Sequence, residues 1–182
     1  MRLISATEVN LVETKERKDE KEKSKWLSWV VFAVMMAAVI FTFRYVIGIT
    51  VISGNSMSQT IESNDVILSS HLLYQPERND IIIFRDEHGY DVIKRIIALP
   101  NETIEISDGV VFVDGQPFEE SYVSGISNDM EKTVVEEDAY FVMGDNRTPG
   151  ESLDSRSADV GTIARERIKG EALLSLIPFR LF

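Results

Sequence analysis

The longest stretch without a charged residue constrains this chain most. Residues 26–43 (WLSWVVFAVMMAAVIFTF) contain no charge, glycine or proline, and their apolar side chains would surround a helix on all sides. A helix of a soluble domain carries a polar face instead. Together with residues 44–47, the segment is long enough, at about 1.5 Å per residue, to cross a hydrocarbon core of about 30 Å. We therefore expect residues 26–47 to form one transmembrane anchor helix rather than a buried core helix.

The charges that flank this segment predict its orientation. Basic residues are concentrated before it, and after Arg44 the next one is Arg78; the preceding ones are Lys15, Arg17, Lys18, Lys21, Lys23 and Lys25. Positive charge marks the cytoplasmic side of a span. A cleavable secretory signal has a shorter apolar core, and no small-x-small site follows here. We expect a cytoplasmic charged tail (1–25), a single-pass anchor (26–47) in the cell membrane, and an extracytoplasmic domain (48–182) beside the lipid bilayer.

Composition excludes several classes of function. Acids outnumber bases 30 to 19, and a net charge of −11 argues against nucleic acid as a partner. No cysteine is present, which rules out disulfides, thiolate metal sites and cysteine nucleophiles. With two histidines, His71 and His88, a multi-histidine metal site has few ligands available, so we expect no metal.

The part after the apolar segment has the pattern of β-structure. Short apolar or β-branched runs recur at 49–52, 66–68, 81–84, 92–99, 103–106, 110–113, 140–143 and 168–176. The pair Asp114-Gly115 predicts a hairpin, and Pro117 predicts that the returning strand is an edge strand. Short strands without alternating amphipathic helices predict a mainly β domain, an antiparallel sheet closed as a barrel or stacked as a sandwich.

Without cysteine, and with histidine scarce, a nucleophilic enzyme would need serine or threonine with an unusual base, for which lysine is the leading candidate. The predicted outer domain has three lysines: Lys94, Lys132 and Lys169. Lys132 lies in a predicted acidic loop, where carboxylates would raise its pKa. Lys94 interrupts the strand DVIKRIIAL, and strand alternation places the apolar residues Val92, Ile96 and Ala98 on its face, a setting that lowers an amine pKa. On residue type alone, a solvent-facing strand lysine is the commoner outcome.

Two polar segments could supply the other groups. In SGNSMS (53–58), the pair Gly54-Asn55 permits a tight turn that presents a serine hydroxyl and leaves a backbone N–H free for an oxyanion. The second segment is GDNRTPGESLDSR (144–156). Taken alone, the first is a polar turn, and the second is a loop with ion pairs.

Together and in this order, these segments resemble the type I signal peptidases, membrane serine proteases with a Ser/Lys dyad. SGNSMSQTI (53–61) resembles the nucleophile box of the family, NDIIIF (79–84) its structural strand, KRIIALP (94–100) its lysine box, and 144–156 its last box. The chain lacks the large inserted second domain of some Gram-negative members, which suggests the Gram-positive type.

The resemblance assigns roles to individual residues. It implies that Ser56 is the nucleophile, Lys94 the general base, and Ser152 the hydroxyl that orients the lysine amine. Gly54 occupies a position that supplies a second oxyanion donor in some members. Residues that brace the site through ion pairs and hydrogen bonds would be Asp145, Asp154 and Arg156. Pockets for small side chains of the substrate would be lined by Ile52, Met57, Ile61, Ile83 and Ile93.

The implied function is removal of signal peptides from secretory preproteins by cleavage after small-x-small motifs, without a cofactor. Two alternatives stay open from the sequence. One is a regulated or self-cleaving Ser/Lys peptidase related to the SOS repressors, and the other is an inactive paralogue that binds exported proteins.

The match departs from the family pattern at several positions. Gln59 stands where the family usually has proline, and Asn79 where it often has glycine. The usual Gly-x-x-Gly-Asp end of the lysine box is replaced at Ala98, Asn101 and Glu102. Four residues separate Arg147 from Ser152 where the family leads us to expect two, an insertion that could displace Ser152.

Overall fold

The computed structural model of the chain describes residues 25–71 and 74–182. Internal contacts divide the chain into two units, Met1–Arg44 and Tyr45–Phe182. The predicted charged tail lies outside the described residues except for Lys25. Each unit is described below by itself.

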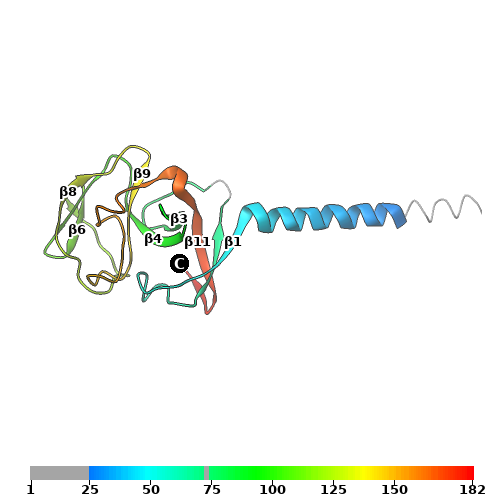
Figure 1. The fold of residues 1–182 in the computed structure, drawn as a ribbon, viewed down its shortest axis with the longest axis horizontal. Helices are drawn as coiled ribbons and strands as arrows, with labels where there is room; N and C mark the ends of the chain where they lie inside the picture. Colours follow the sequence, from blue (N-terminus) through cyan, green and yellow to red (C-terminus); the bar gives the residue numbers. More distant parts are fainter. Residues whose placement is uncertain (1–24, 72–73) are drawn as a thin grey trace, which may run out of the picture. The chain divides into compact units, whose positions relative to one another are not determined.

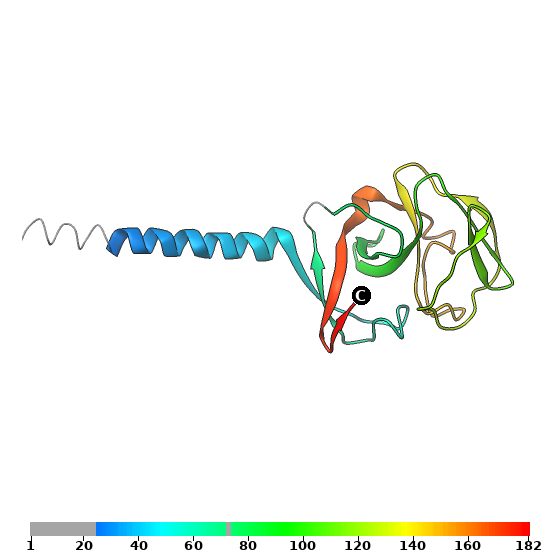
Figure 2. The same cartoon turned by 180° about the vertical axis from the view of Figure 1, so that it is seen from behind.

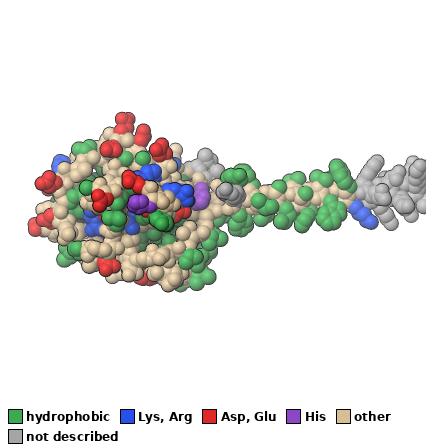
Figure 3. All heavy atoms as spheres, viewed as in Figure 1, with side chains coloured by type: hydrophobic (Ala, Val, Ile, Leu, Met, Phe, Trp, Pro, Cys, Tyr) green, Lys and Arg blue, Asp and Glu red, His purple; other side chains and the backbone are tan. Residues whose placement is uncertain are grey.

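The described part of the first unit is helical. An α-helix occupies residues 25–41, and the π-helical turn η1 (Thr42–Val46) follows it. Every described residue of 25–41 is exposed, and Figure 3 shows apolar side chains along this helix. The ring of Trp29 meets that of Phe32 edge to face, with centroids 6.0 Å apart. Among the described residues, no helix is both long and apolar enough to span a membrane. The transmembrane anchor at 26–47 therefore stays a prediction.

The second unit is built from short strands and one 3-10 turn, η2 (Arg165–Arg167). Its strands are β1 (Ile47–Val51), β2 (Val66–Ser70), β3 (Ile81–Arg85), β4 (Asp91–Ala98), β5 (Thr103–Ser107), β6 (Val110–Val113), β7 (Gln116–Pro117), β8 (Met130–Val134), β9 (Ala139–Met143), β10 (Ile163–Ala164), β11 (Ile168–Ile177) and β12 (Phe179–Leu181).

These strands form two antiparallel sheets. The larger sheet has the order β1-β2-β11-β3-β4-β9-β10, with β12 paired to β11, and the smaller has the order β7-β6-β5-β8. Figures 1 and 2 show β6 and β8 at one end of this unit and β1 and β11 at the other. All paired strands run antiparallel, so the predicted mainly β, antiparallel domain is confirmed.

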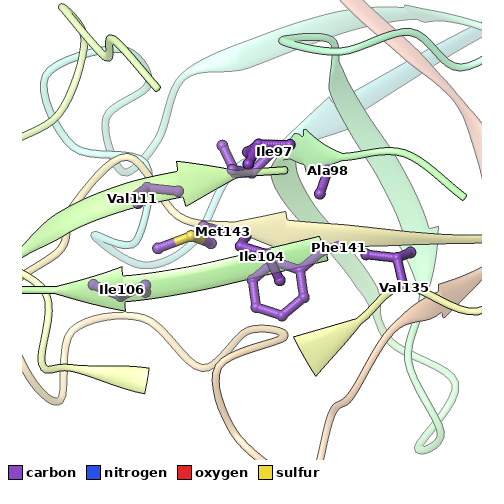
Figure 4. Close-up of a cluster of buried hydrophobic side chains, with 9 residues drawn as sticks. Ile97, Ala98, Ile104, Ile106, Val111, Val135, Phe141 and Met143 are labelled. Atoms are coloured by element: carbon purple, nitrogen blue, oxygen red, sulfur yellow. The ribbon is translucent and has the colours of Figure 1, made fainter. Parts of the chain in front are cut away.

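Three apolar clusters form the core of the second unit. The first joins the two sheets, as Figure 4 shows; its buried members are Ile97, Ala98, Ile104, Ile106, Val111, Val113, Val135, Phe141 and Met143. The second comprises Ile52, Met57, Ile61, Ile67, Ile81, Ile83, Ile93 and Ala172. The third comprises Ile82, Phe84, Ile96, Tyr140, Val142, Ile163 and Ile168. β4 and β9 lie between these clusters, and side chains on both faces of each strand are buried. Accordingly β9 is apolar throughout, and β4 is apolar apart from Asp91, Lys94 and Arg95.

The hairpin prediction is also confirmed. Val113 pairs with Gln116, so Asp114 and Gly115 form a two-residue loop in which both have positive φ, 50° and 75°. This is the backbone that Asp-Gly favours between antiparallel strands. Pro117 lies in β7, an edge strand of the smaller sheet, where its missing N–H interrupts no ladder.

Two sequence-based expectations about lysine surroundings were wrong. Lys132 lies in strand β8, not in a loop; this edge strand is largely exposed, so it shows no apolar run. Ala98 does not share the surroundings of Lys94, because the β4–β9 register shifts between Ile96 and Ala98. The irregularity turns Ala98 into the first cluster, whereas Ile96 and Val92 pack in the third.

Candidate active site

Two residues from separate segments meet beside β4, an interior strand of the larger sheet. Lys94 lies in the middle of β4, opposite Ile82 of β3, and Ser56 lies in the loop that follows β1. The Lys94 Nζ donates a hydrogen bond of 2.6 Å to the Ser56 Oγ. A serine hydroxyl at this distance from an amine can transfer its proton directly.

The surroundings of Lys94 lower the pKa of its amine. The residue is 4% exposed. Burial lowers the pKa of Lys94 to about 8, since the charged ammonium loses water; the carboxylates of Asp154 and Asp145 oppose this shift, and Arg156 adds to it. At pH 7, about one-tenth of such an amine is neutral and able to accept a proton.

The loop that carries Ser56 is held in a compact shape by its own backbone. The Ser58 N–H donates to the Asn55 carbonyl at 3.0 Å, and the Ile61 N–H donates to the Met57 carbonyl at 2.8 Å. Gly54 has φ of +110°, a conformation open to glycine and strained for other residues. In the described part of the chain, the Ser56 N–H donates to no protein group, so it is available to an oxyanion.

A buried ion pair joins the serine loop to the lysine strand. Arg95 donates from Nε and Nη2 to the two carboxylate oxygens of Asp145, at 2.9 and 2.6 Å. The Thr60 hydroxyl donates to the same carboxylate at 2.6 Å. Thr60 belongs to the loop of Ser56 and Arg95 adjoins Lys94 in β4, so Asp145 connects the two segments that carry the dyad.

Asp154 forms a second polar centre on the other side of Gly144. Its carboxylate accepts hydrogen bonds from the Gly144 N–H at 2.9 Å and the Ser152 hydroxyl at 2.6 Å, and it pairs with Arg156 at 2.7 Å. Burial alone would raise the pKa of Asp154, but the hydrogen bonds and charge of Arg156, with those from Ser152 and Gly144, keep it below the ordinary value. Asp154 therefore acts as an anion that holds the Gly144 backbone.

Ser152 lies beside the dyad without a hydrogen bond to Lys94. A Cβ on Gly144 would come within 2.3 Å of both the Ser152 Oγ and the Ser56 carbonyl oxygen, so these two atoms lie close together. The Ser152 hydroxyl donates to Asp154, and among the described residues the hydrogen-bond partner of the Lys94 amine is Ser56. The hydrogen bond that the resemblance implies between Ser152 and Lys94 is not made in this structure.

An apolar cleft of about 190 Å³ opens next to the dyad. Its lining is Thr50, Val51, Ile52, Ser53, Gly54, Ser56, Met57, Ile83, Asp91, Val92, Ile93 and Lys94. Four of the residues expected to line substrate pockets, Ile52, Met57, Ile83 and Ile93, contribute to it. Ile61 does not line the cleft; it is fully buried in the second apolar cluster together with these four. The cleft is small, which limits the side chains that it can accept.

The backbone explains several departures from the family pattern. Asn79 and Asn101 have φ of 75° and 68°, a region that asparagine tolerates better than most residues, which accounts for asparagine in place of glycine. Gln59 has φ of 82°, which proline cannot adopt. Glu102, in place of aspartate, pairs with Arg78 and accepts a hydrogen bond from the Leu99 N–H at 2.7 Å.

Sequence reasoning missed part of the support for the site. Tyr122 stacks on the Arg95 guanidinium at 3.9 Å, and Glu120 forms a buried ion pair with Arg147. The Tyr122 hydroxyl lies 3.2 Å from both the Asn79 Oδ1 and the Glu120 Oε1, and its single proton can be donated to either acceptor. An arginine inside an apolar strand, as Arg95 is, signals a buried acidic partner, but the sequence does not identify which acid.

A protein-family model described as signal peptidase, peptidase S26, matches residues 23–177. The chain belongs to this signal peptidase family. A signal peptidase I of Bacillus licheniformis is 29% identical over 91% of this chain and 96% of its own length. The signal peptidase I P of Bacillus subtilis subsp. natto is 33% identical over 87% of this chain and 92% of its own. A signal peptidase I structure from Enterococcus faecalis V583 matches with a TM-score of 0.46 and 31% identity, covering 54% of this chain and 97% of that one.

Membership of the family makes this chain a signal peptidase of the serine hydrolase class, as the sequence predicted. The family match and the curated relatives favour neither the self-cleaving regulator nor the inactive paralogue.

We expect this signal peptidase to depend on the Arg95–Asp145 pair for stability. Arg95→Met would leave the fully buried Asp145 carboxylate without its cation and lower the free energy of unfolding by about 3–5 kcal/mol. Arg95→Met combined with Asp145→Asn removes both charges and should recover part of that loss. Arg85→Met is the control, because Arg85 pairs with Asp91 at the surface. This substitution should lower the free energy of unfolding by about 1 kcal/mol or less. Denaturant unfolding of the detergent-purified full chain measures all four proteins; equal losses in Arg95→Met and Arg85→Met would contradict the expectation.

Proposed function

We propose that this signal peptidase cleaves secretory preproteins after small-x-small motifs with Ser56 as nucleophile and Lys94 as general base. The observation that carries the proposal is the 2.6 Å hydrogen bond between the Ser56 Oγ and an amine whose pKa burial lowers to about 8. A serine needs an adjacent base to become nucleophilic, and a lysine can be that base only when its amine loses its proton near neutral pH.

The reaction runs in two steps. The neutral Lys94 amine takes the Ser56 proton as the Ser56 Oγ attacks the scissile carbonyl, and the resulting ammonium returns that proton to the leaving amine. The C–N bond breaks, and the signal peptide stays as an ester on Ser56. Lys94, neutral again, then takes a proton from water as the water oxygen attacks the ester carbonyl. The C–O bond to Ser56 breaks, the Lys94 ammonium returns its proton to the Ser56 Oγ, and the signal peptide leaves with a free carboxylate.

The remaining site residues have supporting roles in this proposal. The free Ser56 N–H donates to the oxyanion. A hydroxyl donor at position 54 is lacking, because the residue there is Gly54. Asp145 and Asp154 hold the segments that carry the dyad, and Arg156 keeps Asp154 ionised. Ser152 acts as a positioning residue beside the dyad and not as a direct partner of the amine.

Specificity for small side chains follows from the cleft. Its walls near Ser56 are the apolar side chains of Ile52, Met57, Ile83 and Ile93, and its volume is about 190 Å³. An alanine side chain fits such a space, and burying it there is favourable, whereas a charged side chain would lose its hydration.

The anchor completes the proposal. The described helix exposes apolar side chains along residues 25–41, and such a surface is costly in water. We place residues 26–46 of the predicted anchor (26–47) across the cell membrane with the N-terminus in the cytoplasm, since the lysines precede the segment. Ile47 pairs with Ser70 in the sheet and therefore lies outside with residues 48–182. The site then acts on preproteins on the outer side of the membrane.

Removing either member of the dyad should abolish cleavage. We expect Ser56→Ala and Lys94→Ala to lower kcat/KM on a preprotein with an Ala-x-Ala site by about 10⁴-fold or more, since Lys94 is the base that contacts Ser56 in the described part of the chain. Ser58→Ala and Lys132→Ala are matched controls and should keep normal rates. Mass spectrometry of the products locates the cut, and an unfolding curve shows that each variant is folded. Residual activity of Lys94→Ala near the level of the unaltered protein would eliminate Lys94 as the base.

The rate should rise with pH, because the active form is the neutral Lys94 amine. Burial lowers the pKa of Lys94 to about 8, so protonation removes activity as the pH falls through this value. We expect log kcat/KM to rise with a slope of about one below pH 8 and to level off above it. Initial rates between pH 6 and pH 10 test this, with Lys132→Ala as a control for the same profile. A rate independent of pH in this range would contradict a lysine base.

The anchor predicts how the chain behaves in membrane fractions. Full-length protein should stay in the pellet after alkaline carbonate extraction, and protease added outside intact spheroplasts should digest the 48–182 part. The double variant Met36→Lys, Val39→Lys should weaken insertion, since each lysine at the centre of a span raises the free energy of membrane insertion by about 3 kcal/mol. Val134→Lys, on the exposed strand β8, is the control. Complete extraction of the unaltered chain by carbonate would refute the anchor.

A further inference from the structure

A second hollow lies next to the dyad, and the proposed mechanism places no part of the substrate in it. Its volume is about 330 Å³, and it shares no lining residue with the apolar cleft. Its lining is Asn128, Asp129, Met130, Thr148, Pro149, Gly150, Ser152, Asp154, Arg156 and Ser157. Seven of these ten residues have polar side chains, whereas six of the twelve residues that line the cleft are apolar.

The segment that forms one wall of this hollow contacts the Ser56 loop at both of its ends. The Asn146 N–H donates to the Ser56 carbonyl at 2.9 Å, and its side-chain amide donates to the Asn55 carbonyl at 3.2 Å. At the other end, Ser152 packs against Gly144 together with the Ser56 carbonyl. The residues between these anchors, 147–151, are the segment that is longer than the family pattern predicts. Thr148, Pro149 and Gly150 of this segment line the hollow.

A peptide cut at Ser56 must occupy space on both sides of the serine. The apolar cleft, formed by the end of β1 and by β4, takes the side chains before the cut, as proposed above. The residues after the cut leave Ser56 away from that cleft, and a chain extends about 3.3 Å per residue, so only the first few can lie near the dyad. The polar hollow reaches Ser152 and lies within this range.

The charges of the hollow indicate which side chains it favours. The Arg156 guanidinium is paired with Asp154 and also donates to the Ser127 hydroxyl, so these two lining charges compensate each other. The Asp129 carboxylate is exposed, and among the described residues it has no ion pair or hydrogen bond. The hollow therefore carries one uncompensated negative charge.

We propose that this hollow, walled by 148–150 and Asp129, is a binding site for the first residues of the mature protein and prefers basic over acidic side chains there. The inference rests on the proposed function, because it needs Ser56 to mark the cut. It assigns the inserted segment to substrate recognition on the product side, which the apolar cleft does not cover.

The test compares peptides that differ only after the cut. Each has the same Ala-x-Ala site, with Lys, Gln or Glu at the second, third or fourth mature position in turn. With the full-length enzyme in detergent, we expect the Lys peptide to exceed the Glu peptide in kcat/KM by about fivefold at one or more positions, with the Gln peptide between them. Asp129→Asn should bring the ratio close to one, and Asp129→Lys should invert it. Rates on the Gln peptide should change less than about twofold in both variants.

Glu105→Gln is the matched control. It removes one exposed carboxylate from β5, outside the hollow, and so changes the net charge by the same amount as Asp129→Asn. The Lys-to-Glu ratio should stay at the level of the unaltered enzyme in this variant and fall as salt is added. A ratio near one in the unaltered enzyme, or a ratio that survives Asp129→Lys, overturns the proposal. Failure of the proposed function would give a different result, because the Gln peptide itself would then not be cut. That result would refute both the proposed function and the binding site that rests on it.

Discussion

The burial of the Lys94 amine is the constraint on which the rest of this structure depends. An ammonium group taken out of water costs free energy, and the protein accepts that cost at a position in β4 next to the third apolar cluster. Among the described residues, the hydrogen-bond partner of the amine is the Ser56 hydroxyl at 2.6 Å. A hydroxyl does not compensate a positive charge as a carboxylate would, so the pKa falls to about 8. The same burial that destabilises the charged form gives the signal peptidase its proposed base.

Within residues 25–71 and 74–182 the Lys94 amine has no ion pair with a carboxylate, so the acids nearby have to be held away from it. Asp145 and Asp154 both raise the pKa of Lys94, and each is paired with its own arginine, Arg95 and Arg156. These pairs also fix the backbone around Gly144, from which the Ser56 loop and the Ser152 segment are positioned. Charge compensation and placement of the site are therefore carried out by the same contacts. This explains why a region rich in ions surrounds a base that must become neutral.

The two hollows beside the dyad differ in chemistry because they are built from different parts of the chain. The apolar cleft is formed by strands and by the residues that follow β1, where sheet packing supplies isoleucine and methionine side chains. The polar hollow is formed by loops, where turn residues and charges predominate. Loops can change length without disturbing the sheets, so the 147–151 segment can differ from the family pattern while the dyad stays in place.

The sequence by itself determined the local elements and the residue types that chemistry requires. The apolar runs predicted the core strands, Asp114-Gly115 predicted a hairpin, and the absence of cysteine left Lys94 as the candidate base. Those features depend on neighbours along the chain. The tertiary structure alone decided that Asp145 pairs with Arg95, that Ser56 lies within hydrogen-bond distance of Lys94, and that Ala98 faces away from Lys94 at a register shift. Such contacts join residues far apart in sequence or depend on strand register, and neither residue periodicity nor composition encodes which partners long-range packing brings together.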